Sequence, residues 1–76
     1  MVHGYSQRLI ERNGQANRHL LGVRLGQACI KHQVPVSAVA REFKVSRQTV
    51  YSWFTGAANP SAPVRASVDA YIAKLS

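Results

Sequence analysis

Residues 35–56 of the chain read PVSAVAREFKVSRQTVYSWFTG, and this stretch decides the fold. Its apolar residues recur at three- and four-residue spacings, on one face of a segment that follows Ser37 and on one face of a second segment, 47–55. Residues 44–46 separate the two segments. The pattern predicts two short helices joined by a tight turn, with a polar face left free on the second helix.

Residues that end helices occur at suitable places in this stretch. Ser37 is the predicted N-cap of the first helix and Ser46 that of the second, and Gly56 is placed to end the second helix in a left-handed conformation. Val34 precedes a proline and is therefore disfavoured in a helix. We therefore expect any helix that precedes this stretch in the chain to end before Pro35.

A helix-turn-helix makes further demands on side-chain size, and the stretch meets them. Ala40 provides the small residue where the two helices cross, and Val45 provides an apolar plug for the turn. Val50 and Trp53 are spaced to reach the core from the second helix. In this motif the first helix supports the second, which can enter the DNA major groove.

The composition limits the class of protein. The chain has 76 residues, 46% of them hydrophobic and 17% charged, which is enough for one small globular domain. Ten Lys and Arg against three acidic residues give a net charge of +7, so a polyanion is the expected partner. The basic residues are spread singly, no apolar run approaches the roughly 20 residues of a membrane span, and the first residues lack a signal-peptide core. Nucleic acid is favoured over a membrane, and a cytoplasmic location is expected.

Two further helices are predicted around the motif. Residues 16–33 carry apolar residues at helical spacing, and so do residues 61–75. The apolar face of the first consists of Leu21, Leu25, Ala28, Cys29 and His32, widened by Leu20 and Ile30. The apolar face of the second consists of Val64, Val68, Tyr71, Ile72 and Leu75.

Gly22 and Gly26 lie four residues apart, on one face of the 16–33 helix. Either another helix approaches closely there, or the glycines are merely tolerated at a cost of about 1 kcal/mol each. The sequence does not separate these alternatives.

Residues 1–15 are basic and contain Gly4 and Gly14. Ser6 could cap a short helix from Gln7 to Arg12, but a helix of this length is marginal without packing. The alternatives are a loosely ordered tail with solvated charges and a basic arm that follows DNA. The predicted organisation is an arm at 1–15 and a domain at 16–76, with the motif at 37–56, in an all-α, compact bundle of four to five helices.

Residues 37–56, SAVAREFKVSRQTVYSWFTG, resemble the helix-turn-helix of the phage Cro and repressor family, also called the lambda-repressor-like or XRE family. The portion VSRQTVYSWFTG is the most similar. The resemblance implies a transcriptional regulator, most of all a Cro-like repressor, that binds double-stranded DNA as a homodimer on an inverted repeat. Two positions depart from the family: Lys44 stands where many members have glycine, and Val36 where many have a phosphate-binding glutamine.

The exposed face of the second motif helix supplies the candidate base-reading residues. Arg47 can donate two hydrogen bonds to guanine and Gln48 can pair with adenine, and both lie at the helix end that enters the groove most deeply. Tyr51 and Ser52 lie one turn later, and the resemblance places all four on the base-reading face. The candidate phosphate contacts are Ser37, Arg41, Lys44, Ser46 and Thr55.

Tyr71, Ile72 and Leu75, near the end of the last helix, form a candidate dimer surface. The alternative is packing of these residues onto the 16–33 helix. A dimer is expected because one motif reads only a few base pairs.

Two other functions share these features: the DNA-recognition subunit of a recombination, packaging or transposition complex, and an antitoxin or anti-activator module that binds protein. An enzyme is not expected, because the chain has no nucleophile with a nearby base, no carboxylate pair and no glycine-rich phosphate loop. One cysteine and three scattered histidines do not form a metal-ligand pattern. We therefore expect no metal, no cofactor and no small-molecule ligand.

Overall fold

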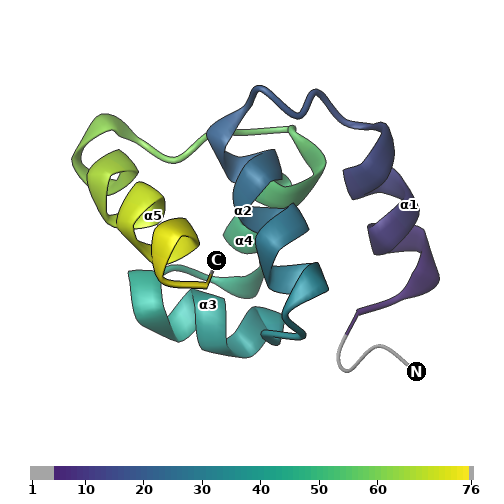
Figure 1. Cartoon of the computed structure of the whole chain (residues 1–76), viewed down its shortest axis with the longest axis horizontal. Helices are drawn as coiled ribbons and strands as arrows, with labels where there is room; N and C mark the ends of the chain where they lie inside the picture. The colour runs from purple at the N-terminus through teal and green to yellow at the C-terminus, as the bar shows by residue number, and fades with distance from the viewer. Residues whose placement is uncertain (1–4, 76) are drawn as a thin grey trace.

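The computed structural model describes residues 5–75, and this part of the chain is all helical (Figure 1). Its five helices are α1 (Gln7–Gln15), α2 (Leu21–Lys31), α3 (Val36–Phe43), α4 (Arg47–Thr55) and α5 (Ala62–Leu75). No strand occurs within residues 5–75. The prediction of an all-α bundle of four to five helices is confirmed.

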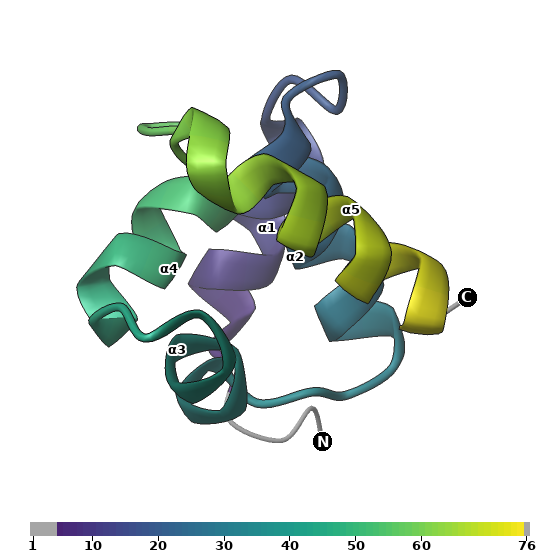
Figure 2. The ribbon, with the colours of Figure 1, turned by 90° about the vertical axis from the view of Figure 1, so that its left-hand side faces the viewer.

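Helices α2 and α4 lie at the centre of the bundle. α2 packs against α1, α4 and α5, while α4 packs against α1, α2 and α3. Figure 2 shows α5 crossing one side of the molecule and α1 lying behind, on the far side of α2 and α4. The core draws on all five helices; its largest fully buried side chains include Phe54, Leu25, Val23, Val39, Val50 and Val68.

The second helix of the motif has its predicted bounds and caps. The Ser46 hydroxyl accepts a hydrogen bond from the Thr49 backbone N–H at 3.1 Å, and Gly56 ends the helix with a left-handed φ of 82°. Val50 and Trp53 are buried, as expected for the inner face. Phe54 is also buried, so that face is wide and apolar.

The predicted start of the first motif helix is wrong. α3 begins at Val36, with Pro35 in the N-cap position, and no side chain caps it. Val36 is buried, and the Pro35 carbonyl accepts from the N–H groups of Ala38 and Val39. Ser37 is therefore a first-turn residue and not the cap. Because Val36 is buried, it becomes the first residue of α3, one position before Ser37.

The turn between α3 and α4 places Lys44 in the left-handed region, with φ of 56°. The next N–H, that of Val45, donates to the Ala40 carbonyl at 3.0 Å and so satisfies the end of α3. Lys44 therefore takes a conformation that glycine adopts most easily. Lysine is strained there.

We expect Lys44→Gly to be more stable than Lys44→Ala by about 1 kcal/mol, because only glycine adopts this φ without a Cβ clash. Both variants remove the same charge, so their difference isolates the backbone effect. The measurement is thermal unfolding followed by circular dichroism, in which the glycine variant should melt about 4–8 °C higher. An alanine variant that melts at or above the glycine variant would contradict the expectation.

α2 is shorter than the predicted helix over 16–33. The Asn17 side-chain oxygen accepts from the His19 N–H at 2.9 Å, which forms a local turn that delays the helix to Leu21. At the other end Gln33 has a φ of 58°, so the helix stops at Lys31. His32 is consequently exposed instead of lying on the apolar face, and Val23, absent from the predicted face, is fully buried.

Cys29 is fully buried in the core, as predicted for a small apolar residue. Desolvation by burial raises the pKa of its thiol to about 12. Burial therefore favours the neutral thiol over the reactive thiolate.

The two glycines of α2 allow α4 to approach closely. A Cβ atom on Gly22 would lie 2.7 Å from the Trp53 carbonyl oxygen, and one on Gly26 would lie 2.5 Å from Nδ2 of Asn13 on α1 and 2.9 Å from Cγ of Phe54. The contact decides the alternative that the sequence left open: these glycines form the crossing point of two helices.

Residues 5–15 are ordered by packing. Ser6 caps α1 as expected, but the helix extends to Gln15, beyond the predicted end at Arg12. Tyr5, Leu9 and Asn13, at spacings of four, are buried in the common core. A loosely ordered tail therefore does not describe this segment. The predicted arm also includes residues 1–4, which lie outside the described part of the chain.

Helix α5 matches its prediction closely, with Pro63 in its first turn. Val68 is fully buried, and α5 packs on α2. Tyr71 meets the ring of Phe43 edge-on, with centroids 5.4 Å apart. This packing closes the side of the bundle opposite α1 (Figure 1).

Candidate nucleic-acid interface

Helix α4 is supported on three sides, by α1, α2 and α3, and its remaining side faces outward. Arg47 and Gln48 are exposed on that side, Tyr51 is 41% exposed, and Ser52 is half-buried. Tyr51 is the one large hydrophobic side chain that is exposed among residues 5–75. The structure thus brings the four predicted base-reading residues to one surface, with Ser52 at its edge.

The N-terminal end of α4 has no negatively charged side chain in its first turn. The hydroxyls of Ser46 and Thr49 lie 3.0 Å apart, in hydrogen-bond contact with each other. The free N–H groups and the dipole of a helix N-terminus favour an anion. A phosphate is therefore compatible with this end of α4, where Arg47 adds a formal positive charge.

A groove separates α4 from the beginning of α3. It is lined by Pro35, Val36, Ser37, Arg47 and Tyr51. Ser37 therefore lies beside the candidate reading face. Its contact with a phosphate stays a prediction, and it does not cap the helix.

A larger groove of about 460 Å³ runs along the other flank of α4, between α4 and α1. From α4 it is lined by Gln48, Tyr51, Ser52 and Thr55. From α1 and its N-cap it is lined by Ser6, Arg8, Leu9 and Arg12, and Ala57 completes it. Two arginines outside the predicted set of site residues are thus next to three of the four predicted base-reading residues.

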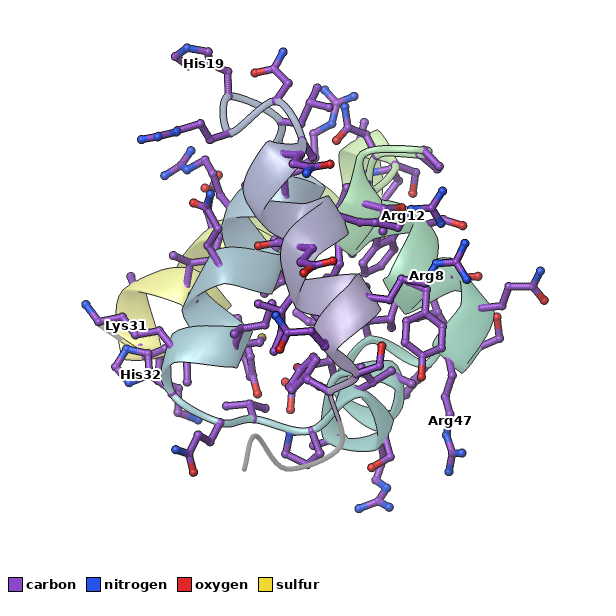
Figure 3. The ribbon with its side chains drawn as sticks, turned by 90° about the vertical axis from the view of Figure 1, so that its right-hand side faces the viewer. Arg8, Arg12, His19, Lys31, His32 and Arg47 are labelled. Carbon is purple, nitrogen blue, oxygen red and sulfur yellow. The ribbon has the colours of Figure 1, made fainter. Side chains whose placement is uncertain are left out.

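Figure 3 shows where several basic residues lie on the molecule. Arg8 and Arg12 of α1 and Arg47 of α4 lie along the same edge of the molecule, while Lys31 and His32 lie on the opposite edge. The charge on this edge comes from two helices that are separated in the sequence. The four-residue spacing of Tyr5, Leu9 and Asn13 is a sequence signal for α1. This signal is weak because only one of the three residues, Leu9, is aliphatic.

The remaining predicted phosphate contacts are less well grouped. Arg41 is exposed in the last turn of α3. Lys44 is exposed too, but it borders a groove with Pro63 and Val64 at the start of α5, away from the α1 flank. The Thr55 hydroxyl donates to the Tyr51 carbonyl at 2.9 Å, so it is not a free donor for a phosphate.

The candidate dimer surface is partly used within the chain. Tyr71, Ile72 and Leu75 are each half-buried and pack against the core. Burial also raises the pKa of Tyr71 above its usual value. Packing of α5 within the bundle accounts for the buried part of these side chains. A dimer through their exposed part stays a prediction.

Comparison with protein-family models, curated proteins and solved structures finds no match to this chain. Within residues 5–75, no group of three or more His, Cys, Asp or Glu side chains is placed to hold a metal ion. Over the same residues, no helix has the length and apolar character needed to cross a membrane.

Proposed function

We propose that this protein is a sequence-specific double-stranded DNA-binding transcriptional regulator, a Cro-like repressor in which α4 reads bases in the major groove. The observation that carries the proposal is the environment of α4: three helices support it, and its free side bears Arg47, Gln48 and Tyr51. The major groove is about 12 Å wide and accepts one helix with its side chains. Arginine and glutamine at the start of such a helix are the side chains that recognise guanine and adenine.

The charge of the whole chain supports the same partner. A net charge of +7 favours binding to the phosphate backbone and speeds encounter with DNA. The +7 charge and the Arg47–Gln48 pair argue against a module that binds only protein. Because one such helix reads few base pairs, the proposed active form is a homodimer on an inverted repeat.

The test begins by selecting duplexes from a randomised library and measuring affinity for the enriched sequence. Arg47→Ala is expected to lose about 1–3 kcal/mol of binding free energy and to relax the preference at one base pair, because a bidentate contact to guanine disappears. The loss applies to each half-site of the inverted repeat, and both quantities are measured by fluorescence anisotropy with the selected duplex and its single-base variants.

Arg24→Ala is the matched control. Arg24 is exposed on α2 in a groove shared with Lys31, away from α4, so this variant makes the same charge change at a remote site. It should keep the base preference of the wild type. Enrichment of no sequence by the wild type would refute the proposed function, and an Arg47→Ala variant with unchanged affinity and preference would refute the assigned reading face.

A further inference from the structure

Helix α1 is held firmly against α4, although the two are far apart in the sequence. The Asn13 side-chain amide donates to the Phe54 carbonyl oxygen at 2.7 Å, and the ring of Tyr5 stacks on Phe54 with centroids 6.2 Å apart. The Tyr5 hydroxyl also donates to the Val34 carbonyl. α1 is therefore a fixed part of the surface that surrounds α4.

Arg8 and Arg12 lie on the α1 face that borders the groove beside α4. They are four residues apart, hence on one side of the helix, and both are exposed. None of the described residues that line this groove is acidic. Tyr51 and Leu9 provide apolar surface, and Gln48 and Ser52 provide hydrogen-bonding groups on the opposite wall. The groove suits an anionic, partly apolar chain such as a sugar–phosphate backbone.

The dimensions of DNA determine what α1 can contact if α4 reads bases. A helix with its side chains is about 10–12 Å across, so the major groove of about 12 Å is filled by α4 alone. A neighbouring helix packs at about 8–10 Å from the first and therefore lies over the strand that borders the groove. Four residues of α1 rise about 6 Å, which exceeds the 3.4 Å of DNA axis for each phosphate on one strand. Arg8 and Arg12 can therefore reach different phosphates.

We propose that the groove between α1 and α4 binds the sugar–phosphate backbone of one DNA strand, with Arg8 and Arg12 each neutralising a phosphate. This inference rests on the proposed function of α4. It assigns α1 a role as a rigid phosphate clamp that sets the depth and register of α4 in the groove. Phosphate contacts of this kind position a protein on DNA without selecting a sequence.

The experiment measures the dissociation constant for the selected duplex from about 50 to about 200 mM salt. For Arg8→Gln/Arg12→Gln the slope of log affinity against log salt should become shallower by about 1.8 for each bound protomer, hence by about 3.6 for the homodimer, since each lost phosphate contact removes about 0.9. The ratio of affinities for the selected duplex and its single-base variants should not change. Glutamine preserves helix propensity, and an unchanged circular dichroism melt verifies the fold.

Two further variants make the result specific. Arg24→Gln/Lys31→Gln removes the same charge from the α2–α5 side, and its slope should stay at the wild-type value. Arg8→Lys/Arg12→Lys keeps both charges and should restore the wild-type slope. Equal slope changes in the two glutamine double variants would show that the effect depends on net charge alone. That result would overturn the assignment of Arg8 and Arg12 as a phosphate clamp.

The outcomes separate this inference from the proposed function. If the wild type selects a sequence and Arg47→Ala relaxes it, while Arg8→Gln/Arg12→Gln leaves the slope unchanged, the clamp alone is wrong. If Arg8→Gln/Arg12→Gln changes the preferred base instead of the slope, the arginines read bases and the phosphate assignment is overturned. If the wild type selects no duplex, both proposals fail.

Discussion

Replacing Asn13 by aspartate is expected to lower the free energy of unfolding by about 3 to 5 kcal/mol at pH 7, because it buries an unpaired charge. Asn13 is 3% exposed and is the buried polar side chain among residues 5–75. Its amide donates to the carbonyl oxygens of Val23, at 3.2 Å, and of Phe54, at 2.7 Å. One side chain thus joins α1, α2 and α4.

The substitution keeps the shape of the side chain and removes its two donors. The carbonyl of Phe54 belongs to the last turn of α4, where the C=O groups have no N–H donor within the helix. Loss of the Asn13 amide donor therefore leaves this carbonyl oxygen facing a carboxylate oxygen. A chain of 76 residues has a total stability of only roughly 4 to 11 kcal/mol. Asn13→Asp should therefore be close to unfolding at neutral pH.

The pH dependence provides a second signature of the same cause. Burial against two carbonyls should raise the pKa of the new carboxyl above the usual value of about 3.9. A raised folded-state pKa means that the variant is most stable below about pH 4, where the protonated acid can donate to one carbonyl, and loses stability as pH rises. The difference in unfolding free energy from the wild type, measured by urea denaturation, should thus be smaller at pH 4 than at pH 7.

Asn17→Asp is the control for the chemical change alone. Asn17 is exposed and its side-chain oxygen accepts from the His19 N–H, a role that a carboxylate retains. Its variant should stay within about 0.5 kcal/mol of the wild type. An Asn13→Asp variant that is equally stable, or that shows no pH dependence relative to the wild type, would contradict the role assigned to Asn13.

Replacing Gly22 by valine is expected to destabilise the protein by about 3 kcal/mol or more, because the added atoms meet the backbone of α4. A Cβ at this position would lie 2.7 Å from the carbonyl oxygen and 2.9 Å from Cα of Trp53. Backbone atoms cannot turn aside as a flexible side chain can, so α2 and α4 must separate. Their separation would open the core on both sides.

Gly14→Val is the matched control for this substitution. Gly14 is also helical, but nothing lies within 4 Å of a Cβ built there. Since valine and glycine differ little in helix propensity, this variant should change the unfolding free energy by less than about 0.5 kcal/mol. The pair is compared by urea denaturation. Equal losses in both variants would show that backbone propensity, and not the crossing of α2 and α4, sets the cost.

Local features of the sequence were sufficient to predict the helix-turn-helix. Ser46 and Gly56 act on their own neighbours, and Val50 and Trp53 follow the helical period, so each could be recognised without a fold. The prediction failed where burial outweighed a local preference. Val36 is needed in the core, and α3 therefore starts one residue before Ser37.

The candidate reading face was also predictable, because Arg47, Gln48 and Tyr51 are opposite the apolar face of the same short helix. The residues that surround that face were not predictable from the sequence. Arg8 and Arg12 belong to a segment whose own apolar content is too small to define a helix, and Tyr5 and Asn13 become core residues only through Phe54, Val34 and Val23.

The sequence by itself determined the two helices of the motif, the caps of α4 and the polar face of α4, because capping and periodicity depend on residues within about one turn of each other. Tertiary structure decided where α1 lies, why Gly22 and Gly26 are glycines, and which cations accompany α4. Those features depend on contacts such as that between Asn13 and Phe54, which are 41 residues apart. Such contacts form only when the whole bundle packs.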